Sequence, residues 1–127
     1  MEIINMQATG YVPGIVLDKE NGKMELSGRA CPEDPLEFYQ PVFDWLDDYA
    51  EAPLEKTVFD FRLSYYNTAT SKILMMLMQR LEELSDDGNN VLVRWHYMED
   101  DEDMQESGED YAEMVEVEFE FLPYEDE

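Results

Sequence analysis

Apolar and polar residues alternate in some stretches of the chain and recur every three or four residues in others. The first short extended stretches are GYVPGIVLD, residues 10–18, and KMELSGRA, residues 23–30. They flank Lys19-Glu20-Asn21-Gly22, whose Asn-Gly pair tolerates the positive φ angles of a tight turn. The chain is therefore predicted to open with a β-hairpin.

Two longer segments have the period of a helix with one apolar face. Asp34 is the expected N-cap of the first, with Pro35 at the first helical position, and Pro41 is a candidate position for a kink. The second is expected from about Thr68 to Leu84, closed by residues 87–89. The apolar positions of the first helix are Leu36, Tyr39, Val42, Phe43, Leu46, Tyr49 and Ala50.

Three more strands are expected around these helices. TVFDFRLSYY, residues 57–66, places Phe59, Phe61, Leu63 and Tyr65 on one face and Asp60, Arg62, Ser64 and Tyr66 on the other. NVLVRWHYM, residues 90–98, is predicted to be an internal strand, and EVEFEF, residues 116–121, a final strand. The stretch between them, residues 100–115, predicts a loop or a short amphipathic helix.

The resulting order, ββαβαβ(α)β, combines an opening hairpin with strand–helix–strand crossovers. We therefore expect an α/β fold in which helices pack on a mixed β-sheet through right-handed crossovers. A chain of 127 residues, 44% of them hydrophobic, has room for one core, so residues 1–127 are predicted to form a single domain.

The charge of the chain limits its partners. It has 32 acidic and 8 basic residues, a formal net charge of −24, which repels nucleic-acid phosphates and anionic membrane surfaces. The single cysteine, Cys31, cannot form an internal disulfide. No apolar run is long enough to span a membrane, and the polar N-terminal stretch is unlike a signal peptide. We expect a cytoplasmic protein that binds neither nucleic acid nor membrane.

Several patterns that suggest active sites fail on residue chemistry. The acidic segment from Glu99 to Asp110 puts Gly108 out of register with a calcium-binding loop, so a solvated surface is expected. His96 follows strand periodicity without a nucleophile motif, and acidic neighbours make Cys31 a poor nucleophile. The glycines are scattered singly and form no phosphate loop. No catalytic residue, metal site or cofactor is predicted.

The start of the second helix, SYYNTATSK at residues 64–72, is the unusual stretch. At 100° per residue, Thr70 points with the core-facing side of the helix, whereas Thr68 points outward with Lys72 and Met75. Met75 is therefore expected to lie opposite the sheet, away from the core. The core-facing positions are Ile73, Leu74, Leu77, Leu81 and Leu84.

Two interpretations of Asn67 and Thr68 follow. They could cap the helix, as short polar residues commonly do at a strand-to-helix junction. Alternatively, Thr68 could be a phosphorylation site, because helix N-terminal amides favour a phosphate and the charge would sit beside an exposed methionine that suits partner docking. The predicted partner-binding residues are Tyr66, Asn67, Thr68, Lys72 and Met75.

Three stretches closely resemble the SiaC family of bacterial regulatory phosphoproteins: PEDPLEFYQPVFDWLDDY, FDFRLSYYNTATSKILMMLMQRLEEL and VRWHYMEDDEDMQESGEDY. The resemblance covers nearly the whole chain and implies a fold similar to the STAS domains of anti-sigma-factor antagonists. It also implies that Thr68 is the phosphoacceptor of a partner kinase, that a PP2C-like phosphatase reverses the modification, and that the unphosphorylated form binds and activates a diguanylate cyclase.

One departure concerns the acceptor. The family usually has serines after the threonine, whereas this chain has Ala69-Thr70-Ser71, which leaves Ser71 and, less favourably, Thr70 as alternative acceptors. The expected function is that of a non-enzymatic, phosphorylation-regulated binding protein. The alternatives are a module of an anti-sigma-factor partner-switching system and a small enzyme whose site is not recognisable from the residues.

Overall fold

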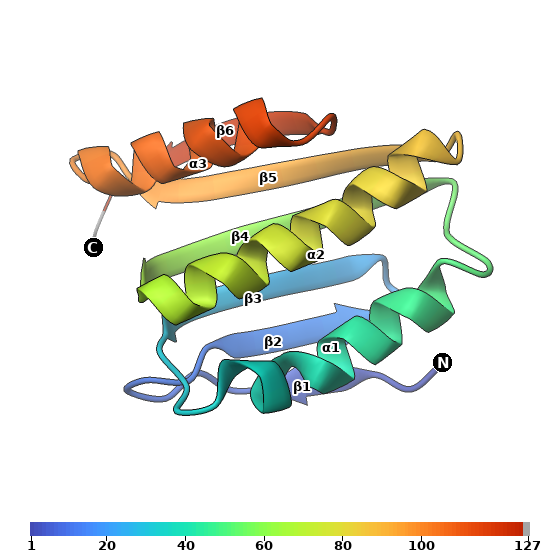
Figure 1. The fold of residues 1–127 in the computed structure, drawn as a ribbon, viewed down its shortest axis with the longest axis horizontal. Helices are drawn as coiled ribbons and strands as arrows, with labels where there is room; N and C mark the ends of the chain where they lie inside the picture. The colour runs from blue at the N-terminus through green and yellow to red at the C-terminus, as the bar shows by residue number, and fades with distance from the viewer. Residues whose placement is uncertain (126–127) are drawn as a thin grey trace.

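The computed structural model describes residues 1–125 and contains one six-stranded sheet with three helices on one of its faces (Figure 1). The strands are β1 (Ile4–Met6), β2 (Gly14–Asp18), β3 (Lys23–Ala30), β4 (Lys56–Tyr66), β5 (Asn90–Met98) and β6 (Glu118–Tyr124). The helices are α1 (Pro35–Tyr49), α2 (Thr68–Asp86) and α3 (Glu102–Met114).

The strands lie in the sheet in the order in which they occur along the chain. β1, β2 and β3 pair antiparallel, whereas β3, β4, β5 and β6 pair parallel through the three helices. Right-handed crossovers that all step in one direction across a sheet place their helices on the same face, which is the arrangement in Figure 1. The predicted α/β fold, with its mixed sheet and opening hairpin, is confirmed.

The sequence-based elements need correction at both ends of the sheet. β1 was not expected, because three residues are too few to show a period, yet Ile4 pairs with Leu17 of β2. Residues 102–114 form a helix, which decides between the loop and the short amphipathic helix expected for residues 100–115. The last strand begins and ends later than predicted and includes Pro123, which an edge strand tolerates because one side of it needs no ladder hydrogen bonds.

The two earlier helices begin and end close to their predicted positions. The Asp34 side chain accepts a hydrogen bond from the Glu37 backbone N–H at 3.3 Å, and α1 continues without interruption through Pro41. On α2, the five predicted core-facing residues are all buried. Within residues 1–125, none of the helices combines the length and the apolar character that a membrane crossing requires.

The core lies between the sheet and the helices and is rich in aromatic rings. Phe61 of β4 contacts Trp95 of β5, and Trp95 contacts Tyr111 of α3, each with ring centroids 5.7 Å apart. The Trp95 indole N–H donates to the Met104 carbonyl oxygen at 2.9 Å. Gly108 of α3 lies directly over this indole, so close that a Cβ there would be 2.5 Å from a ring carbon. The helix can therefore approach the sheet only with glycine at this position.

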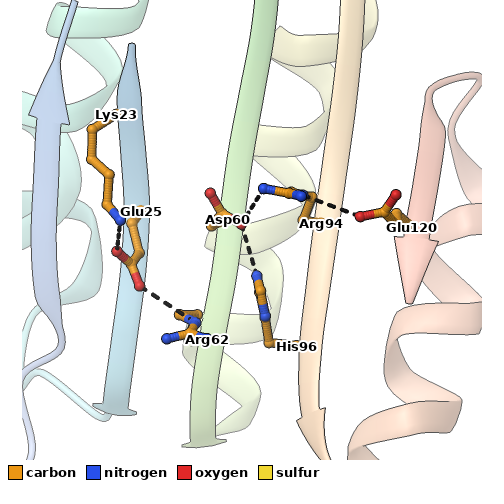
Figure 2. Close-up of polar contacts among 7 residues, drawn as sticks. All are labelled: Lys23, Glu25, Asp60, Arg62, Arg94, His96 and Glu120. Atoms are coloured by element: carbon orange, nitrogen blue, oxygen red, sulfur yellow. Dashed lines mark hydrogen bonds and ion pairs between the residues drawn. The ribbon is translucent and has the colours of Figure 1, made fainter. Parts of the chain in front are cut away.

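The face of the sheet without helices carries ion pairs that join neighbouring strands (Figure 2). Asp60 of β4 accepts from His96 Nε2 of β5 at 2.7 Å when that nitrogen carries the proton, and Arg94 joins Glu120 of β6 at 3.2 Å. Glu25 of β3 pairs with Lys23 at 3.0 Å and with Arg62 of β4 at 3.7 Å. His96 is only 9% exposed, in keeping with the structural sheet histidine expected from its strand position.

A β-bulge near the end of β4 changes which tyrosine faces the helices. Gly28 pairs with Leu63 but Arg29 pairs with Tyr65, so Ser64 is an extra residue on β4. Tyr65 consequently lies on the open face, with the Arg29 guanidinium 4.6 Å from its ring centroid. Tyr66 instead faces the helices beside Tyr111. The predicted strict alternation, with Tyr65 beside Leu63, is wrong at this point.

We expect Gly108→Ala to destabilise the protein, because the new methyl group would collide with the Trp95 ring and displace α3. Alanine favours the helix over glycine by about 1 kcal/mol, but the packing penalty is larger. The free energy of unfolding should therefore fall by about 1–3 kcal/mol. Urea denaturation measures the change. Gly10→Ala is the control, because a Cβ at Gly10 meets nothing within 4 Å; equal stability of both variants would contradict the packing explanation.

Candidate functional site

The start of α2 follows directly from the end of β4 and is capped by Asn67. The Asn67 side-chain oxygen accepts a hydrogen bond from the Thr70 backbone N–H at 2.9 Å, and its carbonyl oxygen accepts from the Ser71 N–H at 3.0 Å. Thr68 is the first helical residue. The capping role therefore belongs to Asn67, which leaves the Thr68 hydroxyl available for another role.

Three hydroxyl side chains in the first turn of α2 differ in exposure. Thr68 is exposed, whereas Thr70 is fully buried with 0% exposure, as the helical period predicted for both. Ser71 is half-buried, and its Oγ donates to the Thr68 carbonyl oxygen at 2.6 Å. Thr68 is thus the hydroxyl of this turn that a modifying enzyme reaches with the least change in the fold.

A groove of about 290 Å³ runs between α2 and α3 beside this turn. Three of the five predicted partner-binding residues, Tyr66, Lys72 and Met75, line it, whereas Asn67 and Thr68 do not. Thr68 adjoins the groove through Ser71, one of its lining residues. The remaining lining residues are Ser107, Asp110, Tyr111 and Met114, all from α3.

Met75 lies in this groove instead of pointing away from all neighbours. It is half-buried and packs against the edge of the core. The helical period placed Met75 opposite the sheet. It could not show that α3 packs beside α2, where it covers part of the Met75 side chain. Met114 across the groove is 61% exposed, so methionine side chains border the groove on both helices. Their flexible thioethers suit an adaptable contact surface.

Tyr111 joins α3 to the first turn of α2. Its hydroxyl donates to the Ser71 carbonyl oxygen at 2.9 Å. Burial, and after it the neighbouring Tyr66 hydroxyl, raises the pKa of Tyr111 far above its ordinary value, so the phenol stays protonated and keeps donating near neutral pH. This hydrogen bond fixes the turn that carries Thr68 relative to the far wall of the groove.

The electrostatic environment of the α2 N-terminus differs from that of the other two helices. α1 has Asp34 as its cap and Glu37 in the first turn, and α3 has Asp101 with further acidic residues, whereas α2 has Asn67 and no acidic residue in its first turn. Lys72 follows Thr68 by four residues, on the same side of the helix. The partial positive charge of this helix end is therefore available to an added anion.

The α3 residues of the groove were not found by sequence reasoning. Their signal was present as a buried stripe at Met104, Gly108, Tyr111 and Val115, but a glycine and nine acidic residues between 99 and 113 concealed it. The acidic segment itself remains a predicted solvated surface. Within residues 1–125 no group of three or more potential ligand side chains is placed to hold a metal ion.

The fold is that of a small α/β protein with one mixed sheet and a capped, exposed start of α2. The sequence matches the SiaC family of regulatory phosphoproteins over residues 6–124, and the chain belongs to that family. It is 32% identical over 116 residues to an uncharacterised protein of Pseudomonas aeruginosa, a match that covers 89% of this chain and 90% of the relative.

Solved structures of SiaC from Pseudomonas aeruginosa share the fold. Apo-SiaC is 29% identical with a TM-score of 0.87, and the match covers 96% of this chain and 99% of that one. SiaC in complex with the diguanylate cyclase SiaD, of which it is the activator, is 28% identical with a TM-score of 0.89, covering 95% and 99%. The resemblance inferred from the sequence motifs is confirmed.

The capping geometry predicts different costs for two neighbouring substitutions. Asn67→Ala removes the side-chain acceptor for the Thr70 N–H and should lower the free energy of unfolding by about 0.5–2 kcal/mol. Thr68→Ala removes an exposed hydroxyl and should change it by less than about 0.5 kcal/mol. Thermal and chemical denaturation of both variants test this, and a larger loss for Thr68→Ala would show that Thr68 contributes to the cap.

The acidic segment from Glu99 to Asp110 should bind divalent cations no more tightly than millimolar. Its side chains are not converged on one point in the described structure, so each cation would meet separate, hydrated carboxylates. Calorimetric titration with calcium and magnesium is the measurement. A stoichiometric heat signal with a micromolar Kd would refute the prediction.

Proposed function

We propose that this protein is a non-enzymatic regulator that binds and activates a diguanylate cyclase when Thr68 is unmodified. A partner kinase phosphorylates Thr68 and thereby ends the interaction, and a PP2C-like phosphatase restores it. The cycle operates in the cytoplasm. Cys31 is a free thiol, so the fold contains no internal disulfide that would need an oxidising compartment.

The observation that carries this proposal is the position of Thr68, an exposed hydroxyl next to a groove lined by flexible apolar side chains. Membership of a family of regulatory phosphoproteins supports a modified hydroxyl. The complex between the Pseudomonas SiaC and its cyclase supports the choice of partner, because the fold of this chain matches that of the Pseudomonas protein over nearly its whole length.

The groove explains how a single phosphate would act as a switch. An effector that docks on Tyr66, Met75 and Met114 also covers the adjoining turn that carries Thr68. A phosphate there would place close to two negative charges in a surface that loses its water, and an unpaired buried charge costs several kcal/mol, or about 100-fold or more in affinity. The net charge of −24 adds like-charge repulsion to any acidic partner.

Lys72 and the α2 N-terminus make the modified state compatible with the fold. The helix end and the lysine one turn later both favour an anion at Thr68, and no acidic residue in the first turn opposes it. Phosphorylation therefore changes the surface without requiring α2 to unfold. The switch depends on the charge presented to the partner.

The alternative acceptors are less accessible. Thr70 is completely buried under the helix, so its modification would require α2 to leave the sheet. Ser71 is half-buried and its hydroxyl is already engaged with the Thr68 carbonyl oxygen, although it lies within the groove. We therefore favour Thr68, with Ser71 second and Thr70 last.

The acceptor is tested by phosphate transfer from the cognate kinase. Thr68→Ala should abolish incorporation, whereas Ser71→Ala should retain it, because the exposed hydroxyl remains in the second variant. Intact-mass measurement followed by fragment mapping distinguishes the two positions. Undiminished labelling of Thr68→Ala would move the site to another hydroxyl.

The direction of the switch is tested by binding of the partner cyclase. Calorimetric titration should show that phosphorylation at Thr68 weakens binding about 100-fold, as expected for an uncompensated interfacial charge. Met75→Glu should weaken binding without any kinase, since it adds a charge inside the groove. Gln79→Glu is the matched control, because it adds the same charge on an exposed residue of α2 that does not line the groove.

Both variants must first show the far-ultraviolet circular dichroism and melting transition of the unmodified protein. Tighter binding of the phosphorylated form would reverse the sign of the switch and would indicate an arginine cluster on the partner that reads the phosphate. Equal effects of the two glutamate substitutions would place the docking surface outside the groove.

A further inference from the structure

A second groove, of about 810 Å³, lies where the loop before β2 meets the start of α1. It shares no lining residue with the groove between α2 and α3. Its lining residues include Tyr11, Cys31, Glu33, Asp34, Glu37 and Phe38.

The backbone that forms this groove is held in place by hydrogen bonds. The Cys31 N–H donates to the Tyr11 carbonyl oxygen at 2.6 Å, which ties the loop to the segment that enters α1. Within the loop, Thr9 and Val12 exchange hydrogen bonds, with the Val12 N–H donating to Thr9 Oγ1 at 3.1 Å and the Thr9 N–H donating to the Val12 carbonyl oxygen at 3.0 Å. The groove is therefore formed before any partner arrives, which lowers the entropic cost of binding.

The two aromatic side chains of the groove, Tyr11 and Phe38, are both partly exposed to solvent. Tyr11 is 66% exposed, although tyrosine is a large side chain that gains from burial. Phe38 is half-buried and rests edge-on against the fully buried Tyr39, with ring centroids 5.0 Å apart. An apolar side chain placed between Tyr11 and Phe38 would contact both aromatic rings and remove them from water.

The rim of the groove is acidic. Glu33, Asp34 and Glu37 contribute three carboxylates, and no lysine or arginine is among the lining residues. The α1 N-terminus offsets only about half a unit of that charge. The rim thus keeps a net negative charge next to the apolar surface.

We propose that this groove binds a basic peptide segment of a partner protein, with an apolar side chain between Tyr11 and Phe38 and flanking arginine or lysine side chains on the three carboxylates. The charges select this occupant over the others that could cover an apolar groove. A second copy of the chain carries a net charge of −24, and the C-terminal residues of this chain are acidic, so both are repelled by the rim.

The proposal is independent of Thr68, because neither Thr68 nor its neighbours line the groove. Both sites nevertheless lie at the same end of the sheet, where the central strands β3 and β4 end and where α1 and α2 begin (Figure 1). A partner attached at the basic-peptide groove is held near the α2 N-terminus whether or not Thr68 is modified, which raises its effective concentration there.

Two labelled heptapeptides test the proposal: one alternates leucine and arginine, and the other has glutamate in place of each arginine. Fluorescence anisotropy should show saturable binding of the arginine peptide to the full chain and none of the glutamate peptide. Because Cys31 is the only cysteine and lines the groove, its alkylation by N-ethylmaleimide reports occupancy. At roughly ten times its Kd the arginine peptide should slow alkylation about tenfold.

Paired variants separate the groove from the general negative charge. The double variant Glu33→Gln with Glu37→Gln should lower the affinity for the arginine peptide about tenfold, as expected for the loss of two rim ion pairs. Glu20→Gln with Glu51→Gln removes the same charge from exposed residues outside the groove and should have little effect. Tyr11→Ser should also weaken binding, and its melting temperature should stay unchanged because the side chain is mostly exposed.

Equal weakening by the two double variants would overturn the proposal, since it would reduce the binding to non-specific attraction. Binding of the arginine peptide without protection of Cys31 would also overturn it, by placing the contact elsewhere. Binding of both peptides with the same affinity would show that the rim charges do not select the occupant.

Discussion

The candidate site depends on the close packing of α3 over Trp95. The indole N–H is satisfied by the Met104 carbonyl oxygen, and Gly108 lets the helix backbone approach the ring. This contact holds α3 on the β5 side of α2, where Tyr111 reaches the first turn of α2 and Met114 borders the groove. Removing the contact would leave Thr68 on a helix without an opposing wall. The groove between α2 and α3 thus depends on a contact between two residues, Trp95 and Gly108, that do not line it.

The elements with strong periodicity could be predicted from the sequence, and those fixed by tertiary contacts could not. The hairpin, α1, α2 and the strands at 57–66 and 90–98 follow from local patterns, as do the exposure of Thr68 and the burial of Thr70. α3 was ambiguous because most of its surface is acidic and its buried stripe includes a glycine that only the position of Trp95 explains. The groove between α2 and α3 depends on the position of α3, so only its α2 side and Tyr66 could be named in advance.

The few cations of this chain are mostly engaged within the protein. Arg62, Arg80 and Arg94 form ion pairs, and Arg29 stacks on an aromatic ring. Individually such surface pairs contribute little stability, but here they reduce the repulsion among acidic side chains on the open sheet face and across α1 and α2. Lys72 is different because it lines the groove between α2 and α3, one helical turn from Thr68, the proposed phosphoacceptor. In a strongly acidic protein, this lysine supplies a positive charge beside Thr68 where most of the surrounding surface is negative.

The bulge at Ser64 decides which of two consecutive tyrosines at the end of β4 faces the helices and which lies on the open face of the sheet. Tyr65 and Tyr66 are chemically identical, but the extra residue turns the first toward Arg29 and the second toward Tyr111. The backbone register, and not the amino-acid type, decides which ring takes part in the groove. A single-residue insertion or deletion in this segment would therefore exchange the two rings between the faces of the sheet. Composition and hydrophobicity would remain almost unchanged, so the sequence identity between two such proteins would hardly differ.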